Sequence, residues 1–116
     1  MKRQTQTFND GIVKIYRVDD ISEPGNMPKD GLILKIDPLR YEERIVGMSR
    51  FYSAKQEQIK IDKLIRAPRI QSISSQDIAV LPSGQYEINQ IQYPPDVMPL
   101  CMDLSLERLV EDYEIG

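Results

Sequence analysis

The chain has 116 residues, of which 41% are apolar, so it has the size and composition of one domain with a single hydrophobic core. It contains no histidine and one cysteine, which removes the commonest general base, the usual partner of a nucleophilic serine or cysteine, and the ligand set of a zinc site. We therefore expect no enzymatic activity, no cofactor and no metal.

The formal net charge of −3 is unevenly distributed along the chain. Residues 1–34 carry five cations and five anions, residues 35–69 carry nine and five, and residues 70–116 carry one and eight. A basic face for duplex DNA is not expected, because phosphate binding needs clustered cations without competing carboxylates. Oppositely charged segments suit contacts between copies or with a charged partner. Solvated surface charges are an equally good interpretation.

The sequence also predicts no membrane contact. It has no run of about 18 apolar residues, and its first residues, "MKRQTQTFNDG", lack the apolar stretch of a signal peptide. A lone cysteine fits a reducing compartment, and we expect Cys101 to be a small buried side chain. These observations predict a cytoplasmic protein.

Frequent turn signals separate short apolar runs, as is typical of an all-β module. Residues 11–18 are predicted to form the first strand. Residues 32–36 are predicted to form the second, which Pro38 ends because proline cannot donate to a β-ladder. Residues 39–46 can resume the strand after that break.

The clearest alternation lies in residues 57–66. Ile59, Ile61 and Ile65 are predicted to face inward, and Gln58, Lys60, Asp62 and Arg66 to face outward.

The last third of the chain predicts a hairpin and one more strand. Residues 77–81 and 85–91 flank a Pro-Ser-Gly turn. Residues 101–106 alternate again, with Met102, Leu104 and Leu106 inward. Residues 104–113 also fit helical spacing, but we favour a strand followed by an acidic tail.

The predicted fold is therefore all-β, a small β-barrel or compact sandwich of about six strands with long polar loops. We expect one domain over residues 1–116, with a flexible N-terminal arm (1–10) and an acidic C-terminal tail (110–116). The long polar connection 18–31 is of the kind that is functional or disordered in compact domains.

One basic segment raises the alternative of single-stranded nucleic-acid binding. Arg50 precedes Phe51 and Tyr52, and several lysines and arginines follow, as in a stacking platform on a small barrel. Such platforms usually expose more aromatic side chains than this segment contains.

The segment from Leu39 to Pro68, "LRYEERIVGMSRFYSAKQEQIKIDKLIRAP", is followed by "QDIAV", "GQYEINQIQ" and "DLSLERL". In this order the segments resemble the head–tail joining proteins of tailed bacteriophages, also called head closure, stopper or head–tail adaptor proteins. The shared features are a glycine followed by Arg-Phe-Tyr-x-Ala, a strand ending in "LIRAP", and a later Gly-x-Tyr-x-Ile. The resemblance spans residues 11–109.

The resemblance implies a small β-barrel that assembles as a homo-oligomeric ring below the portal, in the neck of the virion. It implies a structural role in which the ring extends or closes the portal channel after genome packaging and offers the tail its attachment surface. The implied partners are further copies of the chain, the portal-side adaptor protein, the tail completion or terminator protein, and packaged double-stranded DNA without sequence specificity. The protein is then expected in the host cytoplasm before assembly and in the virion afterwards. A tail completion protein of the neighbouring ring is an alternative.

The resemblance also suggests site residues by position. Residues 41–56 correspond to a loop that projects toward the channel, with Phe51 and Tyr52 anchoring it. The expected channel-facing or interface residues of this loop are Tyr41, Arg44, Arg50 and Lys55. The expected subunit or partner contacts are Lys60, Lys63, Arg66, Asp96, Glu111 and Asp112.

Overall fold

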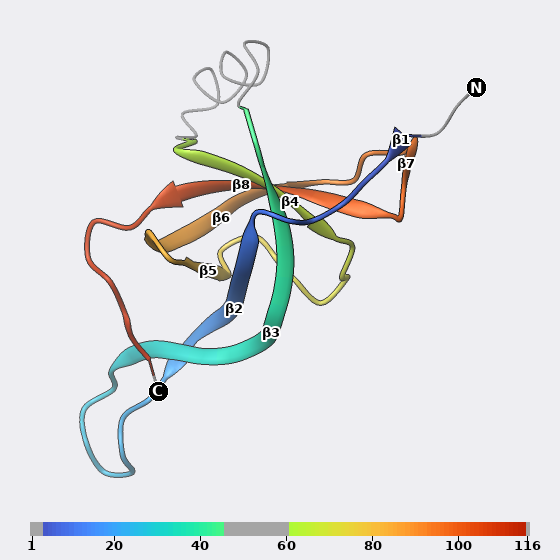
Figure 1. Ribbon diagram of the computed structural model, residues 1–116. Helices are drawn as coiled ribbons and strands as arrows, with labels where there is room; N and C mark the ends of the chain where they lie inside the picture. The colour runs from blue at the N-terminus through green and yellow to red at the C-terminus, as the bar shows by residue number, and fades with distance from the viewer. Residues whose placement is uncertain (1–3, 46–60, 116) are drawn as a thin grey trace.

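The computed structural model describes residues 4–45 and 61–115, and every regular element in these ranges is a β-strand (Figure 1). The predicted all-β class is therefore confirmed. The strands are β1 (Gln4–Thr5), β2 (Gly11–Asp20), β3 (Asp30–Arg44), β4 (Lys63–Pro68), β5 (Ile78–Leu81), β6 (Gly84–Gln92), β7 (Val97–Met98), β8 (Cys101–Arg108) and β9 (Glu114–Ile115).

Six of these strands form a closed ring of hydrogen-bonded neighbours. The order is β2-β5-β6-β8-β4-β3, and β3 pairs again with β2. Every neighbouring pair in the ring is antiparallel. Because the ring is closed, each of these six strands has a hydrogen-bonded neighbour on both sides for at least part of its length. Closure of this kind protects a small β domain from edge-to-edge aggregation. Outside the ring, β9 pairs with β3 and β1 pairs with β7, both in parallel.

The main core is formed by alternate side chains of the ring strands. In β8, Met102, Leu104 and Leu106 are fully buried together, as the alternation predicts. Burial of each such side chain contributes on the order of 1.5–3 kcal/mol to the free energy of unfolding. Other buried members of this core are Val13, Ile15, Leu39, Tyr41, Ile65, Ala67, Ile73, Ala79, Leu81, Tyr86 and Ile88.

A second, smaller core is covered by the C-terminal segment. Tyr16, Leu32 and Ile78 are buried there, with Leu109 and Tyr113 packed against them. The predicted acidic tail therefore carries one anchor, Tyr113, among its carboxylates, and Leu109 packs just before it. The structure has no helix at residues 104–113, and the strand that we favoured there is confirmed up to Arg108.

Pro38 does not end a strand, contrary to the sequence prediction. β3 continues through it as one strand of 15 residues. Val13 pairs with Leu39 and Ile15 with Ile36, so Asp37 and Pro38 lie opposite one residue of β2. This two-against-one arrangement is a β-bulge, where the ladder is interrupted and the missing N–H of proline is tolerated.

The strand predicted over residues 57–66 begins later, at Lys63, and residues 57–60 lie outside the described ranges. Arg66 lies on the face of β4 opposite Ile65, as the alternation predicts, but that face is not open to solvent at this point. Arg66 is buried because its cross-strand neighbour, Asp103, supplies an opposite charge. The predicted hairpin of residues 77–91 is confirmed by β5 and β6, which a Pro82-Ser83 turn connects.

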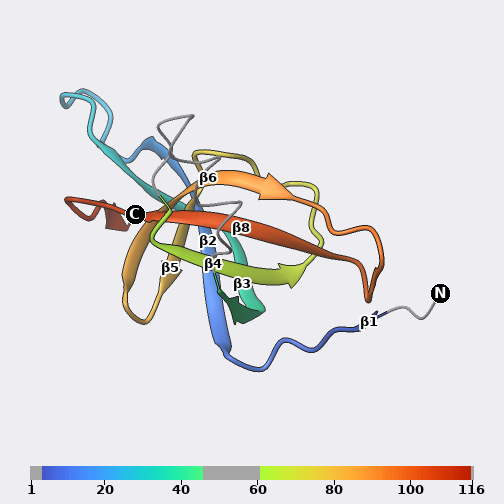
Figure 2. The same cartoon turned by 90° about the horizontal axis from the view of Figure 1, so that it is seen from above.

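Two extensions lie at opposite ends of the elongated molecule, whose principal extents are 59 × 31 × 23 Å. At one end, the hairpin loop (residues 21–29) extends beyond the β2–β3 ladder, and at the other lie β1 and β7 (Figures 1 and 2). In the segment expected to be a flexible arm, residues 4–6 pair with β7 and Gln6 is buried.

Candidate functional site

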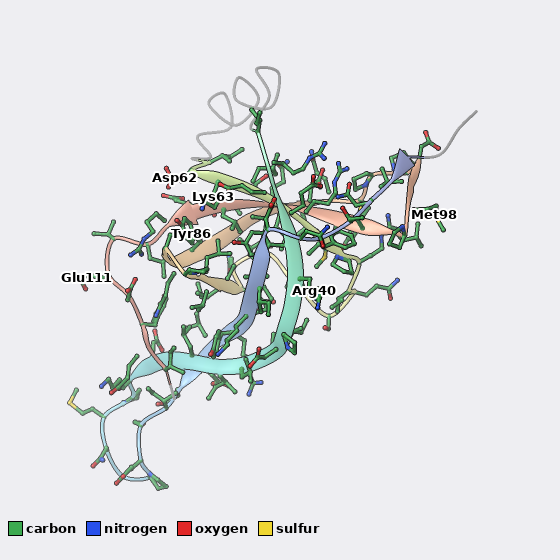
Figure 3. The ribbon with its side chains drawn as sticks, viewed as in Figure 1. Arg40, Asp62, Lys63, Tyr86, Met98 and Glu111 are labelled. Atoms are coloured by element: carbon green, nitrogen blue, oxygen red, sulfur yellow. The ribbon has the colours of Figure 1, made fainter. Side chains whose placement is uncertain are left out.

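Among the described residues, a cluster of cations and aromatic rings lies where β3 ends and β4 begins. We call Tyr41, Glu43, Lys63, Tyr86 and Arg108 the Tyr86 cluster. Lys63 Nζ lies 5.9 Å from the centroid of the Tyr86 ring, and Arg108 Cζ lies 5.7 Å from it. Figure 3 shows Lys63 beside Tyr86. Each cation is therefore placed to interact with the negative face of the ring.

Hydrogen bonds and an ion pair fix the members of the Tyr86 cluster. Lys63 Nζ lies 3.4 Å from Glu43 Oε1, and the Tyr86 hydroxyl lies 2.8 Å from Ser83 Oγ. Burial raises the pKa of the Tyr41 hydroxyl, and the Lys63 ammonium partly offsets this effect. Tyr41 is also a buried member of the main core, so it joins the cluster to that core.

The backbone beneath Arg108 requires a glycine. Gly84 has φ +140°, and a Cβ there would lie 2.5 Å from the Arg108 guanidinium. Arg108 donates to the carbonyls of Gln85 and Leu109 and pairs with Asp112 Oδ1 at 2.9 Å. The glycine of the Gly-x-Tyr-x-Ile motif thus gives room for the cation, and its tyrosine supplies the ring.

A second polar site is buried between β4 and β8. Arg66 donates from Nε to Asp103 Oδ1 at 2.7 Å and from a terminal nitrogen to Oδ2 at 3.1 Å. Its other terminal nitrogen donates to Gln6 Oε1 at 3.1 Å. The hydrogen bond to Asp103 raises the pKa of Arg66 above its ordinary value.

Gln6 connects this buried pair to β3. Its amide nitrogen donates to Glu42 Oε2, which also accepts from Arg44 at 3.4 Å. The network therefore fixes the N-terminal segment across the outer side of the ring and satisfies the Arg66 charge, so it has a structural role.

The third feature is the acidic end of the molecule, at the hairpin loop and the tail. Asp20 Oδ1 accepts hydrogen bonds from the Ser22 amide, the Ser22 hydroxyl and the Lys29 amide. These bonds, first that of the Ser22 side chain, lower the pKa of Asp20. Lys29 in turn pairs with Glu114 of β9 at 2.5 Å, so the loop and the tail are linked.

The structure places the expected site residues in different regions. Tyr41, Arg44 and Lys63 lie at or near the end of β3 and the start of β4, although Tyr41 is buried. Arg66 belongs to the buried pair. Asp96 is exposed before β7, while Glu111 and Asp112 are exposed after β8. Outside the described ranges are Arg50, Phe51, Tyr52, Lys55 and Lys60.

Sequence reasoning did not assign roles to several residues at these sites. Tyr86 lies in the Gly-x-Tyr-x-Ile motif, so a signal for it was present. Asp103 was not assigned, because it lies in a run that is otherwise apolar. An isolated carboxylate in such a run indicates a buried partner, and this was the signal that could have found it. The contacts of Gln6 and Arg108 were also not assigned. Neither was the stacking of Arg69 on Tyr93, in which Arg69 Cζ lies 4.8 Å from the ring centroid.

Within residues 4–45 and 61–115, no three His, Cys, Asp or Glu side chains gather as a metal site requires. The same part of the chain contains no helix long and apolar enough to cross a membrane.

Comparison of the chain with models of protein families, with curated proteins and with solved structures finds no match.

Proposed function

We propose that this chain is a structural virion protein of a tailed bacteriophage, forming a homo-oligomeric ring in the neck between head and tail. The ring extends or closes the portal channel after the genome has been packaged, and it presents the surface to which the tail attaches.

One observation carries the proposal. Three segments on which the resemblance rests, "LIRAP", "GQYEINQIQ" and "DLSLERL", coincide with or overlap β4, β6 and β8, which are neighbours in the order β6-β8-β4. Their side chains also meet in space, because Tyr86 of β6 lies against Lys63 of β4 and Arg108 of β8. The resemblance therefore corresponds to one connected part of the fold.

The distribution of contacts on the surface supports assembly around an axis. A ring needs two different surfaces on each protomer, repeated from copy to copy. The acidic hairpin loop and tail lie at one end of this molecule, and β1 and β7 lie at the other (Figure 1). The protomer therefore presents different surfaces in different regions, as heterologous contacts require.

The proposed partners follow from that position. They are further copies of the chain, the portal-side adaptor, the tail completion or terminator protein, and double-stranded DNA in the channel. Contact with DNA in this role involves phosphates rather than bases, so it carries no sequence information.

Binding of single-stranded nucleic acid is less well supported by the described residues. A stacking platform needs several exposed rings. Tyr16, Tyr41 and Tyr86 are buried, whereas Tyr93 is exposed and is stacked by Arg69. Phe51 and Tyr52, on which that alternative rests, lie outside the described ranges.

The test is disruption of the gene in the phage or prophage that carries it, followed by electron microscopy of the lysate. We expect DNA-filled or leaking heads together with separate tails, and joined particles when the intact gene is supplied in trans. Infectious particles in normal number without the gene would overturn the proposal. Localising the protein in complete particles separates a head closure ring from a tail completion ring.

A further inference from the structure

An apolar groove lies on the outer side of the β2–β3–β5 part of the ring. Two open hollows, of about 180 and 530 Å³, share Ile12 as a lining residue. We call the combined surface the outer groove. Ile12 is 50% exposed and Ile115 is 51% exposed, so large aliphatic side chains face solvent here. The lining residues used below are Ile12, Lys14, Asp37, Arg40, Val80 and Ile115.

The outer groove carries a positive balance of charge beside its apolar floor. Arg40 is the cross-strand neighbour of Ile12 and is exposed; within the described ranges no carboxylate pairs with it. Lys14 reaches Asp37 only at 3.9 Å. An incoming segment that combines an apolar side chain with a carboxylate would complement this surface.

The hairpin loop of the same chain has that chemistry. Met27 is 86% exposed at its tip, and methionine is an adaptable contact residue that is enriched at protein interfaces. Glu23 in the loop is exposed and has no cationic partner among the described side chains. Asp20 holds the base of the loop through its hydrogen bonds to Ser22 and Lys29, so the loop is presented in a defined shape.

We propose that the hairpin loop of one copy docks into the outer groove of the next copy. Met27 enters the apolar floor near Ile12, and Glu23 faces Arg40. The contact joins two different surfaces of one chain, so it is heterologous and builds a ring when the rotation between copies closes. This inference rests on the proposed function, because it names the contact between neighbouring copies in the ring.

Disulfide trapping between two singly substituted full-length chains tests the contact. Met27→Cys and Ile12→Cys proteins, carrying tags of different mass, are mixed at high concentration under mild oxidation. The native Cys101 is fully buried and does not compete. The control mixture combines Met27→Cys with Met98→Cys, because Met98 is exposed and lies near β1. We expect clearly more mixed disulfide-linked dimer from Met27→Cys with Ile12→Cys than from the control mixture. Equal yields for the two mixtures, or no product in either, would overturn the contact.

Charge exchange gives a second readout that does not depend on oxidation. In sedimentation experiments, Glu23→Lys and Arg40→Glu should each weaken self-association by about tenfold or more, and the double variant should regain most of it. If the native chain associates and all of these variants associate equally well, the hairpin contact is wrong while ring assembly stands. If the native chain stays monomeric and no disulfide forms, the contact is also wrong, and the neck role is then judged by the gene disruption alone.

Discussion

Arg66 on β4 and Asp103 on β8 face each other across the sheet and form two hydrogen bonds, of 2.7 and 3.1 Å, with both side chains only 8% exposed. A pair this deeply buried has lost most of its hydration, so each charge depends on the other. Gln6 accepts the third hydrogen bond of the guanidinium. The N-terminal segment is thereby coupled to the stability of the ring.

Replacing one member of this pair should destabilise the protein strongly. Asp103→Ala leaves the Arg66 charge buried without its partner, and we expect it to lower the free energy of unfolding by about 3–5 kcal/mol. The double variant Arg66→Met/Asp103→Leu removes both charges and should be more stable than the single variant. Urea unfolding followed by circular dichroism measures both effects.

The matched control is Arg17→Ala, which breaks the exposed pair of Arg17 with Asp19 at 3.3 Å. Exposed pairs contribute about 0–1 kcal/mol because water screens them. Equal destabilisation by Asp103→Ala and Arg17→Ala would contradict the role assigned to the buried pair.

A side chain at position 84 should destabilise the protein. Gly84→Ala places a Cβ against the Arg108 guanidinium and also forces an alanine to adopt φ +140°, a strained conformation that costs about 1–3 kcal/mol. Gly25→Ala is the control, since Gly25 has φ +87° but nothing within 4 Å of an added Cβ. We expect the larger loss of stability at Gly84, measured by thermal unfolding. In an Arg108→Ala background, the difference in lost stability between Gly84→Ala and Gly25→Ala should be smaller, because the contact with the guanidinium is then gone.

Low pH should loosen the base of the hairpin loop. The pKa of Asp20 lies below its ordinary value of 3.8 because the ionised carboxylate accepts bonds from Ser22 and Lys29. The stabilisation is therefore present above pH 3.8 and is lost as the pH falls through the lower, folded-state pKa. In an NMR titration, the Ser22 and Lys29 amide signals should move with a common midpoint below 3.8.

Two controls test this assignment of the titrating group. Asp20→Asn should abolish the shared midpoint. The Asn26 amide, which donates to the Glu23 carbonyl rather than to a carboxylate, should not follow it. A midpoint for Ser22 and Lys29 that survives in the Asp20→Asn variant would show that another group titrates.

The parts of the fold that could be predicted from the sequence are those specified locally. The β5–β6 hairpin follows from a Pro-Ser-Gly turn between two alternating runs, and both its strands and its turn lie within residues 78–92. The continuation of β3 through Pro38 could not be predicted, because the bulge that accommodates proline exists only against β2. Likewise, the burial of Arg66 depends on Asp103, 37 residues away, and on Gln6, 60 residues away.

The candidate surfaces can also be divided into parts that are specified locally and parts that depend on residues distant in sequence. The sequence indicated that residues 18–31 would be a long polar connection, and the exposed hairpin loop lies within it. The Tyr86 cluster and the outer groove combine side chains from strands distant in sequence, such as Lys63 with Arg108 and Ile12 with Val80. Alternation predicts which side of a strand is polar or apolar, but not which strands become neighbours.

Cys101 should be unreactive while the chain is folded. Its side chain is fully buried, as the sequence led us to expect, and burial raises the pKa of the thiol above its ordinary value of 9.0. Because the thiolate is the reactive form, labelling by a thiol reagent at mildly alkaline pH should be slow in the native protein and fast in concentrated guanidinium chloride, the unfolded control. Asp103→Ala, which removes the partner of Arg66 between β4 and β8, should raise the native labelling rate by the same factor by which it raises the population of open molecules. Rapid labelling of the native chain would show that β8 is accessible, and would remove the assumption on which the disulfide-trapping experiment relies.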